Sequence, residues 1–160
     1  MTRLRQLDAL DARLLRALAA APRATVQALA TATGAARNTV QARLARFEDE
    51  NVLRSFERRI DPASLGYSLT AFVSITVAQQ RLDEVGEALA RIPEVLEVFG
   101  LSGETDLLAQ VAARDADDLY RVAGQILATA GIERTETALA MRHMVPFRLA
   151  PLLDRASRPR

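Results

Sequence analysis

Several residue types that carry common enzyme chemistry are missing or scarce in this chain. Its 160 residues contain no cysteine, which excludes disulfides, thiolate nucleophiles and zinc–thiolate sites. His143 is the single histidine, so neither a histidine-built metal centre nor a Ser-His-Asp triad is expected. No run of 18 or more apolar residues occurs, and the charged start lacks the apolar core of a signal peptide. We therefore expect a cytoplasmic protein without a membrane span, a metal or a cofactor.

Lysine is also absent, so arginine supplies every basic side chain. The net charge of +1 conceals an uneven distribution. Residues 1–60 contain 11 arginines and 6 acidic residues, whereas residues 61–160 contain 10 arginines and 14 acidic residues. A first third at +5 beside a remainder at −4 predicts two domains with different partners. Random scatter of surface charge is the alternative.

Three helices are predicted in the basic third of the chain. Apolar residues at three- and four-residue spacing predict helices over Leu7–Leu18, Val26–Thr33 and Arg37–Glu50. Thr25 is a good N-cap for the second helix. Gly34 can close that helix because glycine adopts the left-handed conformation at little cost.

The second and third helices have the spacing of a helix-turn-helix. Two short helices that cross steeply need a small residue at the contact, a sharp turn and an apolar anchor. Ala30, Gly34 and Val40 supply these three features in order. Alanine-rich helices can imitate this pattern, so the signal has moderate specificity.

The third helix is predicted to have one apolar face and one polar face. At 100° per residue, Val40, Leu44 and Phe47 gather on one side. The other side carries amides, hydroxyls and guanidinium groups, which can bond base edges or phosphates. Because recognition helices point their first turns into the major groove, we expect double-stranded DNA to be the partner. The predicted contacts are Arg37, Asn38 and Gln41 to base edges, Thr39 on the same face, Arg43 and Arg46 to phosphates, and Arg58 and Arg59 as weaker phosphate candidates. A solvated polar face is the alternative.

A wing and a linker are predicted to follow these helices. Val52–Ile60 alternates enough to form a short hairpin or wing, and Asp61-Pro62 marks a turn. The predicted organisation is a winged helix-turn-helix domain over residues 1–60, a linker over 61–68, a second domain over 69–146 and a solvated or loosely docked tail over 147–160.

The second domain is predicted to be ferredoxin-like, which makes the chain α+β. Strands are expected over Leu69–Val77, Val95–Leu101, Asp106–Ala112 and Ile132–Val145, with one helix from Leu82 to Ile92 and another between Asp115 and Gly131. This β-α-β-β-α-β order leaves one face of the sheet uncovered. Such a face usually packs on a second copy, so we expect at least a homodimer.

Five linked segments of the chain resemble the Lrp/AsnC, or feast/famine, family of regulators. They are Leu7-Asp8-x-x-Asp11-x-x-Leu14-Leu15-x-x-Leu18, Gly34 with Thr39-Val40-x-x-Arg43-Leu44-x-Arg46-Phe47-Glu48, Asp61-Pro62-x-x-Leu65-Gly66-Tyr67, Ser102-Gly103-x-x-Asp106-Leu107 and Gly131-Ile132-x-x-Thr135-x-Thr137. The resemblance implies a DNA-binding domain joined to an effector domain. It also implies dimers that assemble further, often to octamers, and a small effector, usually an amino acid, bound between effector domains.

The resemblance also implies where the effector binds. One wall of the site would be formed by Ser102, Gly103, Glu104, Thr105 and Asp106, and another by Thr135 and Thr137. The residues alone leave another interpretation open, in which Gly103 makes a hairpin turn, Asp106 caps it and the threonines face solvent. Ala36 departs from the family pattern because serine is usual there as the N-cap of the recognition helix.

Three functions are compatible with the sequence. The favoured one is a sequence-specific transcription regulator, not an enzyme, whose activity or assembly responds to a small effector. The second is an enzyme that resembles siroheme decarboxylases, which carry histidine-rich motifs where this chain has Phe99–Asp106 without a histidine. The third is an architectural protein that wraps DNA and has no effector.

Overall fold

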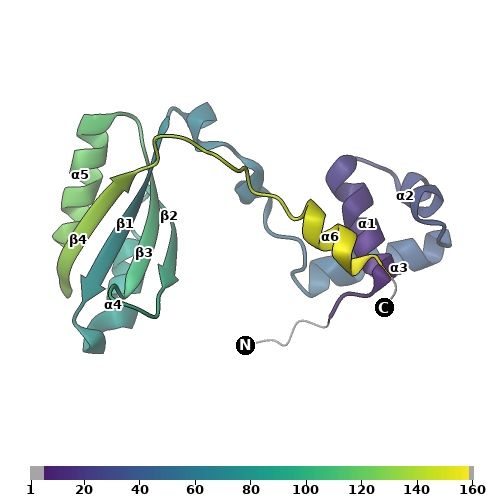
Figure 1. The fold of residues 1–160 in the computed structure, drawn as a ribbon, viewed down its shortest axis with the longest axis horizontal. Helices are drawn as coiled ribbons and strands as arrows, with labels where there is room; N and C mark the ends of the chain where they lie inside the picture. The colour runs from purple at the N-terminus through teal and green to yellow at the C-terminus, as the bar shows by residue number, and fades with distance from the viewer. Residues whose placement is uncertain (1–5, 159–160) are drawn as a thin grey trace. The chain divides into compact units, whose positions relative to one another are not determined.

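The computed structural model describes residues 6–158 and divides into two compact units (Figure 1). Unit 1 consists of the described residues up to Phe56 together with those from Val145 onward, and unit 2 is Glu57–Met144. The segment 57–60, predicted in the first domain, therefore groups with unit 2, and the predicted tail groups with unit 1. Residues 1–5 of the predicted first domain and 159–160 of the tail lie outside the described residues.

Unit 1 contains the three predicted helices, α1 (Ala9–Ala20), α2 (Val26–Thr33) and α3 (Arg37–Asp49). The Thr25 hydroxyl accepts a hydrogen bond from the backbone N–H of Ala28 at 3.2 Å and caps α2. Gly34 ends α2 in the left-handed conformation, with φ 67°. Both local predictions are confirmed because each rests on a conformation that the residue type itself favours.

The core of unit 1 lies between these helices. Val40 and Phe47 of α3 are fully buried against Leu14 of α1 and Leu29 of α2. Leu44 is partly buried beside them. The predicted apolar face of α3 therefore docks the helix on the rest of the unit.

The segment after α3 differs from its prediction. Val52–Ile60 was predicted to form a hairpin or wing, but its regular element is a 3-10 helix, η1 (Phe56–Arg59), and the prediction of a wing is wrong. Phe56 and Ile60 are exposed, and no strand among residues 6–158 pairs with this segment. Without a partner strand the backbone forms local bonds instead, such as Ile60 N–H to the Glu57 carbonyl at 3.0 Å.

Unit 2 is built on a four-stranded antiparallel sheet. Its strands are β1 (Leu69–Val77), β2 (Val95–Gly100), β3 (Leu107–Ala113) and β4 (Ile132–Leu139), in the order β2-β3-β1-β4. The crossing helices are α4 (Leu82–Leu89), which follows the 3-10 helix η3 (Gln79–Arg81), and α5 (Ala116–Leu127). The predicted ferredoxin-like arrangement is confirmed.

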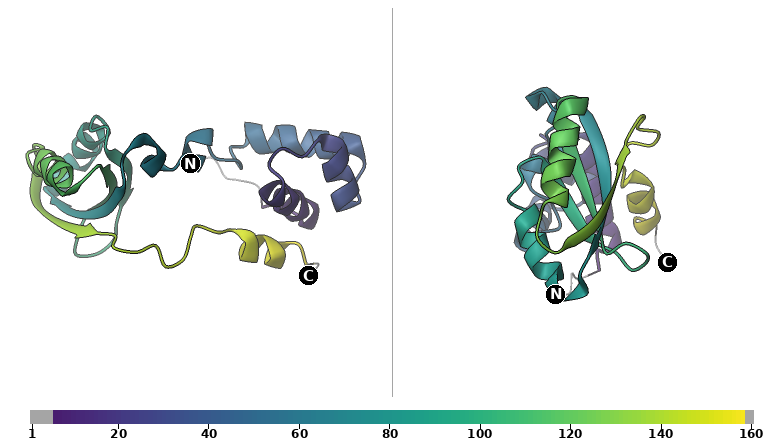
Figure 2. Two further views of the ribbon diagram at one scale, coloured as in Figure 1. Left: turned by 90° about the horizontal axis from the view of Figure 1, so that it is seen from above. Right: turned by 90° about the vertical axis from the view of Figure 1, so that its left-hand side faces the viewer.

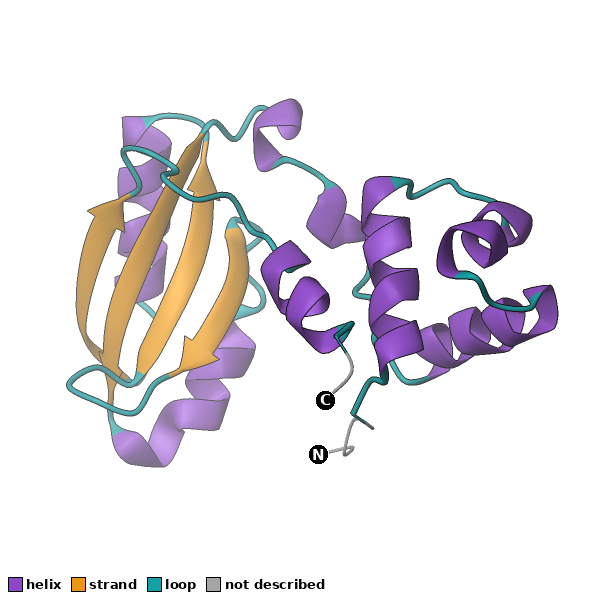
Figure 3. Ribbon diagram, turned by 45° about the vertical axis from the view of Figure 1, so that its right-hand side comes forward, coloured by secondary structure: helices purple, strands orange, loops and turns teal. Residues whose placement is uncertain are grey.

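Both helices of unit 2 cover the same face of the sheet (Figure 3). The core beneath them includes Val73 and Ile75 of β1, Val85 of α4 and Ile126 of α5, all fully buried. The opposite face, here called the open face, carries Phe72, Ser74, Phe99 and Leu108.

Two departures from prediction concern the C-terminal part of the chain. β4 ends at Leu139 instead of Val145, because its partner β1 begins at Leu69 and the Ala140 N–H makes the last bond, to Thr70. The predicted tail contains a helix, α6 (Ala150–Ala156), which lies beside α1 (Figures 1 and 2). Arg16 of α1 donates to Asp154 of α6 at 2.8 Å.

No helix among residues 6–158 is long and apolar enough to cross a membrane.

Candidate nucleic-acid interface and ligand site

The face of α3 opposite its buried side chains is polar and exposed. Arg37, Asn38, Thr39 and Gln41 are all exposed. Within the described residues, none of their side chains makes a hydrogen bond or an ion pair. The hydrogen-bonding groups of these four side chains are therefore available to an external partner, as the prediction of DNA contacts requires.

The start of α3 is electropositive. Ala36 occupies the N-cap with no side-chain hydrogen bond, as expected from its departure from serine. The first turn contains no acidic residue, and Arg37 is its first residue. Free backbone N–H groups and the positive end of the helix dipole both favour an anion here.

Two arginines predicted to contact phosphate are instead paired with carboxylates of α1. Arg43 donates to Asp11 Oδ1 at 2.7 Å and also to Asp8. Arg46 Nη2 lies 2.6 Å from Asp11 Oδ2. Only about a quarter of each arginine side chain is exposed. The bonds with Asp8 and Asp11 raise the pKa of Arg43, so its charge is firmly held in this cluster.

Asp11 is a functional candidate that the sequence reasoning missed. It is 1% exposed and completes a reciprocal capping box with Asp8 at the start of α1. Two hydrogen bonds hold the pKa of Asp8 below its ordinary value: the bond from the Asp11 N–H has the larger effect, and the bond from the Arg43 side chain has the next largest. The signal was present, because Asp11 occupies a position in the apolar stripe of the helix where a lone charge needs a partner.

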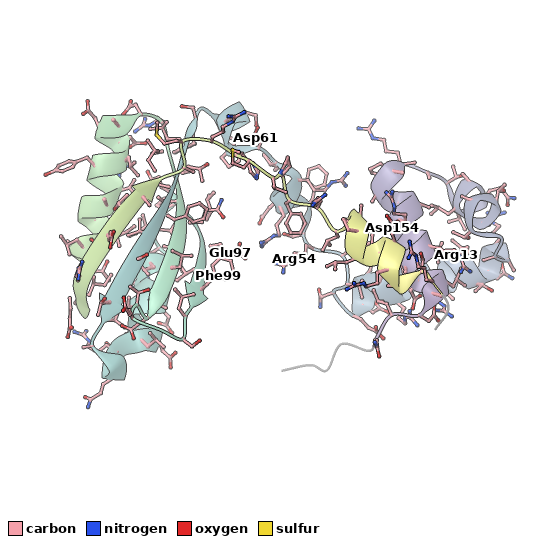
Figure 4. The ribbon with its side chains drawn as sticks, in the orientation of Figure 1. Arg13, Arg54, Asp61, Glu97, Phe99 and Asp154 are labelled. Carbon is pink, nitrogen blue, oxygen red and sulfur yellow. The ribbon has the colours of Figure 1, made fainter. Side chains whose placement is uncertain are left out.

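The two arginines predicted on the wing lie in unit 2. Arg58 makes a bidentate ion pair with Glu97 of β2, with distances of 2.7–2.9 Å. Glu97 and Phe99 project from β2 in Figure 4. Arg59 is exposed on the same 3-10 turn. A phosphate contact from Arg58 would have to compete with this carboxylate.

The predicted effector turn joins β2 to β3. Ser102, Gly103 and Glu104 are exposed, whereas Thr105 and Asp106 are partly buried. Asp106 Oδ2 accepts the Val77 N–H at 2.9 Å. Its backbone bonds Leu101 and Ile75 at 2.8 and 3.0 Å. Asp106 therefore ties this turn to the end of β1, which agrees with the capping role that the residues alone allowed.

A hollow of about 300 Å³ lies beside this turn, lined by Leu82, Gly100, Leu101 and Asp106. Thr135 and Thr137 do not line this hollow within one chain. They pair with Ile75 and Val73 on β1, which separates β4 from β3. Two strand spacings amount to roughly 10 Å. Within one chain, the turn Ser102–Asp106 and the threonines of β4 therefore lie at the same end of the sheet but are separated by β1.

Among the described residues, no group of three histidine, cysteine or acidic side chains is arranged to hold a metal ion.

Comparison with known proteins assigns both units to described families of domains. The AsnC-type helix-turn-helix domain matches residues 7–48, and the Lrp/AsnC ligand binding domain matches residues 70–149. The HTH-type transcriptional regulator AldR of Mycolicibacterium smegmatis is 34% identical over 146 residues, which cover 89% of this chain and 85% of AldR.

Two solved structures are similar over nearly the whole chain. AsnC of E. coli has a TM-score of 0.82 at 23% identity and covers 92% of this chain and 100% of its own, so it bears on the fold alone. A transcriptional regulator of Neisseria meningitidis in complex with L-Met has a TM-score of 0.75 at 25% identity, covering 92% of this chain and 99% of its own.

Proposed function

Because the chain belongs to the Lrp/AsnC family of transcriptional regulators, we propose that it recognises specific DNA sequences through the first turns of α3. A helix-turn-helix domain and a ligand-binding domain make it a transcriptional regulator that binds DNA and a small molecule, not an enzyme.

The proposed DNA contacts are supported by the exposed polar face of α3. Val40 and Phe47 are buried, so the orientation of α3 on unit 1 is fixed. The opposite face then presents Arg37, Asn38 and Gln41 with their hydrogen-bonding groups unused within the described chain. Arginine bonds guanine edges, and asparagine or glutamine bonds adenine edges. We assign these three side chains to bases, with Thr39 beside them.

Four other arginines were predicted to contact phosphates. Arg43, Arg46 and Arg58 are ion-paired in this structure, so a phosphate would have to displace or share a carboxylate. Arg59, on the same turn as Arg58, stays a phosphate candidate. DNA affinity should accordingly depend most on the first turns of α3.

We propose that the effector is an amino acid bound at the turn Ser102–Asp106. The exposed residues around Gly103 offer backbone N–H groups that can hold a carboxylate. The carboxylate of Asp106, of which Oδ2 accepts the Val77 N–H, can pair with an α-ammonium group. The related Neisseria regulator was solved with L-Met, which supports this chemical class. Because β1 separates this turn from Thr135 and Thr137, a second chain would have to bring the two walls together.

We further propose a homodimer that assembles to a higher oligomer, with an octamer as the expected form, in the cytoplasm. The open face supports dimerisation, since Phe72 and Phe99 are 37% and 44% exposed there. Exposed aromatic side chains on a sheet favour burial against a second copy.

The test is selection of bound duplexes from a random pool by the purified full chain, with and without a mixture of the twenty amino acids. The proposal predicts an enriched sequence and an affinity or assembly state that changes with the mixture. Enrichment without any amino-acid response, confirmed by the absence of heat in calorimetry, favours an architectural protein instead. Spectral change on adding siroheme would favour the decarboxylase-like alternative. No enrichment would refute sequence-specific binding.

A further inference from the structure

The buried carboxylate of Asp11 holds two arginines of the helix proposed to read DNA. Asp11 belongs to α1, whereas Arg43 and Arg46 lie on one flank of α3. Oδ1 accepts from Arg43 at 2.7 Å, and Oδ2 lies 2.6 Å from Arg46. Each carboxylate oxygen therefore engages a different guanidinium group, so both arginine side chains are fixed by one residue.

The guanidinium group of Arg46 is turned toward the protein. Its Nε is inaccessible to solvent and makes no hydrogen bond, and its Cζ lies 5.7 Å from the centre of the Phe47 ring. Glu50 adds a second carboxylate at 3.9 Å. An arginine that served mainly to reach a phosphate would not bury this edge against its own helix.

The ion pairs between α1 and α3 are electrically balanced, whereas Glu50, the C-cap residue of α3, adds a further negative charge 3.9 Å from Arg46. Asp8 and Asp11 supply two negative charges, and Arg43 and Arg46 supply two positive charges. If the arginines turned outward to the DNA backbone, Asp11 would remain buried without a counter-charge. Breaking a buried ion pair from one side is strongly unfavourable. The pairs are therefore expected to persist when DNA binds.

We infer that Asp11 is a specificity-determining residue, which acts by withholding Arg43 and Arg46 from DNA phosphates. Affinity for random DNA comes almost entirely from phosphate contacts, whereas discrimination comes from base edges. Two fewer phosphate contacts lower the affinity for random sequence and leave the base-reading residues of α3 to decide where the protein binds. This inference rests on the proposed sequence-specific DNA binding, and Asp11 is a positioning residue that does not touch DNA.

The test compares Asp11→Asn with wild type on the selected duplex and on a scrambled duplex, by fluorescence anisotropy across a salt series. Releasing the two arginines should steepen the salt slope on scrambled DNA by about one to two units and raise its affinity by roughly five- to tenfold per new phosphate contact. On the selected duplex the base contacts of α3 already fix the register of the protein, so the freed arginines have less freedom to reach phosphates there. Affinity for the selected duplex should therefore rise less, and the ratio of the two affinities should fall. Asp11→Glu keeps the carboxylate and should recover much of the wild-type slope.

Asp49→Asn is the matched control because it removes one negative charge from α3 at an exposed position with no side-chain partner among the described residues. It should shift both duplexes alike. If Asp11→Asn behaves in the same way, or leaves the salt slope unchanged, the inference is wrong. Wild type that fails to discriminate between the duplexes would instead overturn the proposed function.

A second variant covers the case in which Asp11→Asn unfolds unit 1, which circular dichroism would reveal. Asp8→Asn, Asp11→Asn, Arg43→Gln and Arg46→Gln together replace the cluster with amides and leave the net charge unchanged; asparagine retains the N-cap of α1. If Arg43 and Arg46 do not contact phosphates in the wild type, removing them should leave the salt slope of this variant equal to the wild-type slope. A slope flatter by about two units would show that both arginines contact phosphates, which contradicts the inference.

Discussion

Ala36→Ser should stabilise the helix that is proposed to read DNA. Ala36 is the N-cap residue of α3, with φ −66° and ψ 143°, the extended conformation that capping residues adopt. Its side chain is exposed, so a hydroxyl group meets no steric obstacle from burial. The caps of the two preceding helices, Asp8 and Thr25, both bond the backbone N–H three residues later. A serine at position 36 can bond the Thr39 N–H in the same way.

The expected gain is about 1 kcal/mol, since replacing a capping serine by alanine costs ~0.5–2 kcal/mol. For a unit of this size, 1 kcal/mol corresponds to a rise of roughly 4–8 °C in the midpoint of thermal unfolding. Calorimetry of the full chain without DNA measures the shift of the transition in which unit 1 unfolds. Amide hydrogen exchange gives a local readout, and exchange of the Thr39 N–H should slow by about fivefold, the factor that corresponds to 1 kcal/mol.

Ala42→Ser is the control because it makes the same chemical change at an exposed position inside α3. Serine is a poorer helix former than alanine, so this variant should lose about 0.5 kcal/mol. If Ala36→Ser gave no gain, or if both variants changed stability alike, the argument from the missing cap would be refuted.

Two further predictions concern unit 2 and the turns. Arg114 donates to Asp118 and holds the pKa of its carboxyl well below the ordinary 3.8, so Asp118→Asn should lower stability at pH 7. The difference in unfolding free energy between wild type and Asp118→Asn should have its full value above about pH 4 and should shrink as the pH falls toward the native pKa of Asp118. Urea unfolding at a series of pH values measures this difference, and a difference that did not change with pH would contradict the prediction. Gly131→Ala should cost more than Gly34→Ala: both have positive φ, but only at Gly131 would a Cβ lie 3.1 Å from Val85. Gly34→Ala should cost about 1–2 kcal/mol, and equal losses in urea unfolding would refute the steric argument.

The parts of the fold that were predicted correctly depend on local chemistry. Thr25 and Gly34 bound α2 because a hydroxyl caps helix starts and glycine accepts positive φ, whatever lies nearby. The strand over Leu69–Val77 was predicted to the residue because its alternation matches a half-buried strand. The wing failed because alternation in Val52–Ile60 is not enough without a partner strand.

The candidate sites were predictable in part. The exposed residues Asn38 and Gln41 follow from helix periodicity once Val40 is known to be buried. The ion pairs of Arg43 and Arg46 could not be predicted, because they depend on how α1 crosses α3 and bring together residues more than 30 positions apart. The docking of α6 on α1 has the same origin.

The central claim is that the exposed face of α3 reads base edges, and the most direct measurement is the affinity of Asn38→Ala for the selected duplex and for scrambled DNA. The account predicts a loss of ~1–3 kcal/mol on the selected duplex and little change on scrambled DNA, because phosphate contacts are unaffected. Equal losses on the two duplexes, or no loss on either, would contradict it.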